Sequence, residues 1–117
     1  MQPQKPVKAD RNNRDYTKAY VPEYRGVVKA WDKYSTHYES FITSEASMHN
    51  EWIFTPFWDT AEEAARAYDV LARIMHLELN FPDEQNDETV YAKLLANPNG
   101  KQWVKELTEL AKERGLE

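Results

Sequence analysis

Alternating apolar and polar side chains between residues 24 and 58 predict a small antiparallel sheet. Strand-like alternation or aromatic enrichment occurs in three stretches, 24–31 (YRGVVKAW), 37–43 (HYESFIT) and 50–58 (NEWIFTPFW). The segments between them, 32–36 and 44–49, are short and polar, as hairpin loops are. Pro56 cannot donate a backbone hydrogen bond, so it marks the end of the third strand or an edge position. The pattern therefore predicts a three-stranded meander.

The hydrophobic period lengthens after this stretch and predicts a helix. Thr60 and Glu63 have the spacing of a capping box at its start, and Asp59 is an alternative N-cap residue. Apolar residues recur on one helix face at Ala64, Tyr68, Leu71 and Met75. Five alanines between residues 61 and 72 make the helix surface thin, so we expect its axis to lie close to a sheet of large side chains. The segment 79–82 (LNFP) is expected to end this unit.

Two more helices are predicted in the last third of the chain. The first covers 87–96, with Asp87 as its N-cap residue and an apolar side formed by Val90, Tyr91, Leu94 and Leu95. Residues 97–100 (NPNG) are typical of a turn. The second helix covers 101–115, with Gly115 at its C-terminal cap and an apolar stripe of Trp103, Leu107, Leu110 and Ala111. We therefore expect an α+β fold, with a three-stranded antiparallel sheet packed on one helix and additional C-terminal helices.

Basic residues are concentrated near the N-terminus. Residues 1–30 carry a net charge of +4, whereas residues 31–117 carry −9. Residues 1–20 are polar and show little hydrophobic periodicity, so they predict a basic flexible arm. Such an arm is either solvated or lies on an acidic partner such as RNA, DNA or an acidic protein face. The expected organisation is this arm, a sheet-and-helix domain over 21–82 and a helical extension over 83–117.

The composition excludes several kinds of site. The chain has no cysteine, so disulfides and thiolate metal ligands are excluded, and its three glycines do not form a glycine-rich phosphate loop. It has no run of 18 apolar residues, so we expect no membrane insertion. Glu62 and Glu63 are interpreted as partners of the helix dipole, and the three histidines lack metal-site spacing. We therefore predict no enzymatic activity, no metal site and no cofactor.

Several of these residues together resemble a plant DNA-binding domain. Tyr24-Arg25-Gly26-Val27, the strands, DTAEEAARAYD from Asp59 to Asp69 and LNFP from Leu79 to Pro82 are similar to the APETALA-two/ethylene-response-factor (AP2/ERF) domain. The resemblance covers residues 24–82 and implies a three-stranded sheet packed on one helix. It also implies that the sheet lies in the DNA major groove and reads bases mostly with Arg and Trp side chains.

The positions that read bases in this family are largely changed here. The family's arginine run after YRGV is replaced by Val28, Lys29 and Ala30. Trp31 stands where the family has its first Trp, Tyr38 replaces the second-strand Trp, and Thr43 replaces a second-strand Arg. Each bidentate Arg–guanine contact contributes about 1–3 kcal/mol of base discrimination. The substitutions therefore predict weakened base readout.

Two functions remain open from the sequence. The first is a divergent AP2/ERF-like nucleic-acid-binding module, such as a transcription-factor-type DNA binder in the nucleus, that holds DNA or RNA. Its expected contact residues are Arg25, Lys29 and Lys33 for phosphates, Trp31 and Tyr38 on or near the reading face, and Lys5, Lys8, Arg11, Arg14 and Lys18 in the arm. The alternative is a repurposed domain that serves as a structural or protein-interaction subunit of a larger protein or ribonucleoprotein assembly, in an organelle such as a mitochondrion or plastid.

Overall fold

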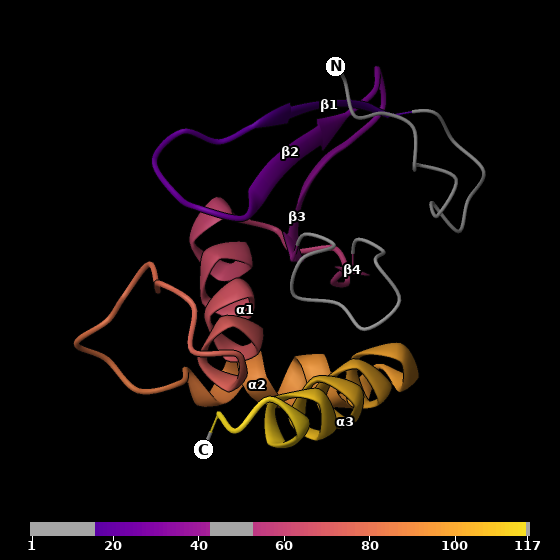
Figure 1. Ribbon diagram of the computed structural model, residues 1–117. Coiled ribbons are helices and arrows are strands. Elements are labelled where there is room, and N and C mark those ends of the chain that lie inside the picture. Colours follow the sequence, from indigo (N-terminus) through magenta and orange to yellow (C-terminus); the bar gives the residue numbers. More distant parts are fainter. Residues whose placement is uncertain (1–15, 43–52, 117) are drawn as a thin grey trace.

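The computed structural model describes residues 16–42 and 53–116 of the chain. Its elements, in chain order, are β1 (Thr17–Tyr20), β2 (Val27–Trp31), β3 (Thr36–Ile42), β4 (Ile53–Phe54), α1 (Ala61–Ile74), α2 (Glu88–Ala96) and α3 (Pro98–Glu113). Figure 1 shows the sheet at one end of the molecule, α2 and α3 at the other end, and α1 between them. The predicted α+β class is confirmed.

The sheet has four antiparallel strands in the order β1-β2-β3-β4, which is one strand more than predicted. The additional strand is β1, which comes from the end of the segment that was expected to be a flexible arm. Its register sets Lys18 opposite Ala30 and Tyr20 opposite Val28. Because four residues are too few to show a clear two-residue period, this strand is defined by its pairing with β2 and not by its own pattern. Residues 1–15 of the predicted arm lie outside the described residues.

The third predicted strand is short and interrupted. β4 ends two residues before Pro56, and pairing with β3 returns at Trp58. Trp58 and Tyr38 exchange two backbone hydrogen bonds, with N-to-O distances of 2.7 and 2.8 Å. Between the two paired positions, the Thr55 hydroxyl accepts a hydrogen bond from the Trp58 indole at 3.0 Å. The expectation that Pro56 marks a strand end is therefore confirmed, whereas the other predicted residues of this hairpin, 43–52, lie outside the described residues.

Helix α1 begins at the predicted cap. The Thr60 hydroxyl accepts a hydrogen bond from the backbone N–H of Glu63 at 3.1 Å. The Glu63 carboxylate accepts in return from the backbone N–H of Asp59 at 3.2 Å, one residue before the position that a standard capping box uses. Both bonds satisfy backbone donors that have no partner inside the helix.

The alanines of α1 pack as predicted. Ala64, Ala65 and Ala67 are completely buried in one cluster with Val27 of β2 and with Trp58. The second half of α1 belongs to a larger cluster that joins the sheet to the C-terminal helices; its buried members are Ile42, Ile53, Val70, Leu71, Met75, Leu94, Leu107, Leu110 and Ala111. Because α1 contacts β2, β3, α2 and α3, it needs small residues on more than one side.

The residues that carry the family resemblance meet where the turn before β2 reaches α1. We call Arg25, Gly26, Tyr68, Asp69 and Asn80 the turn–helix junction. Gly26 has a φ of +75°, and a β-carbon at this position would overlap the Tyr68 ring. The Asn80 side chain accepts from the backbone N–H of Arg25 at 2.8 Å and donates to the Arg25 carbonyl at 3.1 Å.

Buried Asp69 completes the turn–helix junction. Its two carboxylate oxygens accept backbone N–H groups, one from Asn80 at 2.8 Å and one from Phe81 at 2.9 Å. An acid near the middle of α1 thereby holds the segment 79–82 against the helix. The sequence pattern did not show that Asp69 is buried, because a charged residue between alanines also fits a solvent-facing position.

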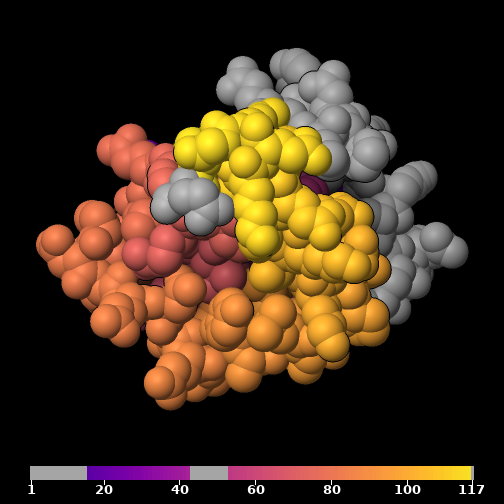
Figure 2. Space-filling model, turned by 60° about the horizontal axis from the view of Figure 1, so that its bottom comes forward, coloured from indigo at the N-terminus to yellow at the C-terminus, as the bar shows by residue number. Residues whose placement is uncertain are grey.

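The C-terminal helices differ from the prediction in two details. α2 begins at the predicted Asp87 cap, but Tyr91, which was assigned to its apolar side, is exposed. The predicted turn 97–100 is instead the start of α3, because the Asn97 side chain accepts from the next backbone N–H groups and Pro98 occupies the first helical position. Figure 2 shows α2 and α3 together on the side of the molecule away from the sheet.

Candidate nucleic-acid interface

The hairpin that joins β2 to β3 carries two pairs of basic and aromatic side chains. We call Lys29, Trp31, Lys33 and Tyr34 the hairpin surface. The Lys29 ammonium lies 5.3 Å from the centroid of the Trp31 ring, and the Lys33 ammonium lies 5.5 Å from that of Tyr34. Figure 1 shows this hairpin at the end of the sheet, away from α2 and α3. It thus presents cations and aromatic rings side by side.

The turn of this hairpin is held by Asp32. Its carboxylate accepts hydrogen bonds from the backbone N–H groups of Tyr34 and Ser35, at 2.8 and 2.9 Å. The backbone N–H of Asp32 also donates to the Ser35 carbonyl at 3.0 Å. Such an aspartate turn fixes the backbone on which Lys33 and Tyr34 are carried. The side chain of Tyr34 is 78% exposed.

Tyr38 lies next to the hairpin surface but belongs partly to the core. It is directly opposite Lys29 in the sheet, and both residues share the side of the sheet on which Val27 meets α1. Its ring packs against the cluster around Trp58 and is half-buried. Tyr38 therefore supports the inner end of the hairpin surface.

The structure places the remaining predicted contact residues elsewhere. Arg25 lies at the opposite end of β2 in the turn–helix junction, where its guanidinium is 3.3 Å from the Glu78 carboxylate. Lys18 lies on the other side of the sheet, which we call the outer face. The predicted arm residues Lys5, Lys8, Arg11 and Arg14 lie outside the described residues.

The outer face corresponds to the side on which Val28 and Ala30 replace the family's arginines. Both residues are buried, and Ala30 has no exposed surface. A buried ionic network that the sequence did not predict lies beside Val28 and Ala30 on this face. One carboxylate oxygen of Glu39 forms an ion pair with the Lys18 ammonium at 3.0 Å. The other oxygen is hydrogen-bonded to His37 Nε2 at 2.7 Å.

This network changes the chemistry of Glu39. Burial alone raises the pKa of a carboxyl group, but the hydrogen bond from His37 and the charge and hydrogen bond of Lys18 outweigh burial and hold the pKa of Glu39 below its ordinary value. Aromatic rings surround the network: Tyr16 and Phe57 have ring centroids 4.6 and 4.0 Å from that of His37. The outer face therefore holds a buried, internally paired ionic network with aromatic rings around it.

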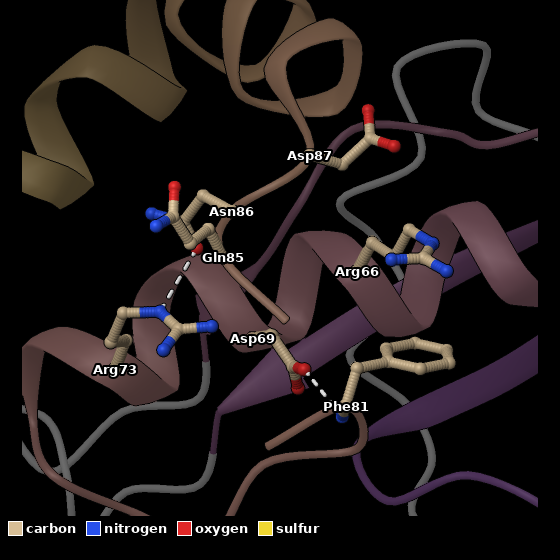
Figure 3. A pocket seen from close by; sticks show the side chains of 7 residues that line it. All are labelled: Arg66, Asp69, Arg73, Phe81, Gln85, Asn86 and Asp87. Carbon is tan, nitrogen blue, oxygen red and sulfur yellow. Dashed lines mark hydrogen bonds between the residues drawn. The ribbon is translucent and has the colours of Figure 1, made fainter. Parts of the chain in front are cut away.

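A shallow hollow beside α1 is a second candidate site. Figure 3 shows its lining residues, which are Arg66, Asp69, Arg73, Phe81, Gln85, Asn86 and Asp87. The Arg66 guanidinium binds Glu84 at 2.8 Å and Glu62 at 3.0 Å, and Arg73 donates to the Asn86 side chain at 3.2 Å and to the Glu84 carbonyl at 2.9 Å. These contacts attach the segment 80–87 to α1, so the arginines serve the fold.

Neither a metal-type cluster nor a membrane-spanning helix is found in the part of the chain that the structure describes. No group of three or more His, Asp or Glu side chains comes together there as a metal site. No helix within residues 16–42 and 53–116 has both the length and the apolar content needed to cross a membrane.

No protein-family model matches this chain, and no solved structure matches it significantly. The hairpin surface is the described region where predicted contact residues come together.

Proposed function

We propose that this chain is a nucleic-acid-binding module, as its resemblance to the AP2/ERF domain implies. The observation that carries the proposal is the hairpin surface: three of the expected contact residues, Lys29, Trp31 and Lys33, lie on one hairpin, exposed or half-exposed, and each lysine lies beside an aromatic ring. Lysines bind phosphate oxygens, and exposed aromatic rings bind bases. The combination fits nucleic acid better than a neutral small molecule.

The distribution of charge sets the expected strength of binding. The chain is acidic overall, with a net charge of −5, so most of its surface repels phosphates. Attraction depends on the hairpin lysines and on the basic N-terminal residues. We therefore expect moderate affinity that falls steeply as salt is added.

A salt titration with charge variants tests this proposal. Labelled mixed-sequence RNA and DNA oligonucleotides are titrated with the intact chain, and the affinity is followed by fluorescence anisotropy at several salt concentrations. The double variant K29Q/K33Q removes two cations, so we expect the slope of log affinity against log salt to become shallower by about 1.4 on single strands.

The matched control is K101Q/K105Q, which removes the same charge from exposed positions on α3. A smaller change in slope is expected for this control than for K29Q/K33Q. Equal effects of the two double variants would show that only net charge matters and would contradict a site on the hairpin. If neither RNA nor DNA binds at low salt, the proposed function is wrong.

A second function, a protein-interaction subunit, is favoured by one observation on the outer face. Tyr20 on β1 is 57% exposed and its ring lies 5.7 Å from that of Phe41, so an exposed aromatic group continues a buried aromatic cluster. Aromatic groups of this kind are enriched in protein interfaces. A partner held here is expected to remain bound at high salt and to be lost with Tyr20→Ala, whereas K29Q/K33Q has no effect on it.

A further inference from the structure

We infer that the hairpin surface binds single-stranded nucleic acid, with unpaired bases stacked on Trp31 and Tyr34 and with Lys29 and Lys33 on the phosphates. This inference rests on the proposed function and names the form of nucleic acid and the side chains that bind it. It differs from the mode that the AP2/ERF resemblance implies, in which strand side chains read duplex DNA.

The lysines leave the rings accessible to bases. Each ammonium lies more than 5 Å from its ring centroid, near the outer limit of about 6 Å for a cation–aromatic interaction. At exposed positions such a contact is weaker than the stacking of a base on an aromatic ring. A bound strand therefore replaces the lysine at the ring, and the lysine moves to a phosphate of the same strand.

The hairpin backbone beneath both rings is held by hydrogen bonds. Tyr34 is 78% exposed, and the Asp32 turn holds its backbone. Trp31 is at the end of β2 opposite Thr36, so it is held by strand pairing. Because the backbone that carries both rings is held before binding, less conformational entropy is lost when bases stack on them.

Duplex DNA fits this molecule less well. Paired bases already stack on one another, so an aromatic side chain reaches a base face only after a base step is opened, which costs a few kcal/mol. On the outer face, the positions that the resemblance assigns to arginines hold buried Val28 and Ala30, and the nearby Lys18 is already paired with buried Glu39. Neither side of the sheet therefore offers the arginines that major-groove reading requires.

The test compares Tyr34→Ala with Tyr34→Phe in the intact chain. The probes are unstructured RNA and DNA strands of about 12 nucleotides and a duplex of the same composition. Because Tyr34 is exposed, its replacement is expected to leave folding intact, which the thermal unfolding transition checks. We expect Tyr34→Ala to weaken single-strand binding about fivefold to a hundredfold and Tyr34→Phe to keep it within about twofold.

Tyr91→Ala is the matched control, because Tyr91 is an exposed tyrosine on α2, away from the hairpin. It is expected to bind both probes like the native chain. Trp31→Ala is the second variant and is expected to weaken single-strand binding by a similar factor to Tyr34→Ala. Preference for RNA over DNA, or the reverse, supports the inference equally and identifies which sugar the surface accepts.

The outcomes separate the inference from the function on which it rests. Single-strand binding that Tyr34→Ala and Trp31→Ala both leave unchanged would overturn the inference, and so would duplex binding tighter than single-strand binding. In both cases nucleic-acid binding itself stands. Failure of every probe to bind at low salt would overturn the proposed function together with the inference.

Discussion

A basic residue lies near each end of β2, but the surroundings of the two ends differ. Just before its start, Arg25 and Gly26 belong to the turn–helix junction. The backbone N–H and carbonyl of Arg25 bind the Asn80 side chain, and the Tyr68 ring lies against Gly26. At its end, the hairpin surface holds two pairs, Lys29 beside the Trp31 ring and Lys33 beside the Tyr34 ring. The first group of residues serves the fold, and the second contributes little to it.

This difference explains why the residues that resemble the AP2/ERF pattern are not themselves a binding surface. The motif residues Gly26, Asp69 and Asn80 are required because they connect the turn, α1 and the segment 79–82. A residue on an exposed hairpin or an outer sheet face is not constrained by this network. The residues that resemble the motif therefore serve the fold, and a binding surface has to be looked for among the residues that the junction does not use.

The strongest way to test the role of the junction is Gly26→Ala. The added β-carbon overlaps the Tyr68 ring, and alanine disfavours the φ of +75°, so we expect a loss of about 2–5 kcal/mol in the free energy of unfolding. Urea denaturation measures this loss. Gly115→Ala is the control, because Gly115 has the same φ with open space around it and is expected to cost only about 1–2 kcal/mol. Equal losses would show that contact with Tyr68 is unimportant.

A smaller effect is expected from Asp69→Asn. The new amide keeps one acceptor oxygen. Its NH₂ group, however, faces one of the two backbone N–H groups that donate to the carboxylate in the native chain. The unsatisfied donor is expected to destabilise the chain by about 1–3 kcal/mol, measured by urea denaturation. Glu62→Gln, which weakens an exposed ion pair with Arg66 on the same helix, is expected to cost less than about 1 kcal/mol. Similar costs for both variants would contradict the structural role of Asp69.

The outer face provides a test through pH. Because the pKa of Glu39 in the folded chain lies below its ordinary value, its stabilising contribution is present above about pH 4.5 and is lost as the pH falls through the lowered pKa. Glu39→Gln is expected to remove this part of the acid dependence of the melting temperature. Lys18→Met removes one of the causes that lower the pKa of Glu39. As the solution is acidified, stability is therefore expected to fall at a higher pH in this variant than in the native chain. An unchanged acid profile in both variants would contradict the network.

The smallest effect on stability is expected at the hairpin surface. Tyr34→Ala removes an exposed ring, so the free energy of unfolding is expected to change by no more than about 0.5 kcal/mol. The same variant is expected to weaken single-strand binding, so binding and stability are separated at this position. A destabilisation as large as that of Asp69→Asn would show that the hairpin ring supports the fold and would remove the contrast between the two ends of β2.

Parts of the candidate site were predictable from the sequence. Lys29, Trp31 and Lys33 were expected contact residues, and the structure places them on one hairpin. Tyr34 was missed, although an aromatic residue next to a lysine in a short polar loop is a usable signal. The partnership of Lys18, His37 and Glu39 had no such signal, because Lys18 and Glu39 are 21 positions apart and meet only through strand pairing.

The amino-acid sequence by itself determined the elements whose signals are local. The Thr60 and Asp87 caps, the alanine face of α1 and the α+β class depend on residues within a few positions of one another, so spacing alone predicts them. The start of α3 also had a local signal in Asn97 and Pro98, which the interpretation as a turn overlooked. Only the tertiary structure decided that residues 17–20 form a fourth strand, that the outer face is closed around Glu39 and that Asp69 is buried. These features depend on contacts between distant segments, whose free energy comes from pairing and burial and leaves no periodic mark on the chain.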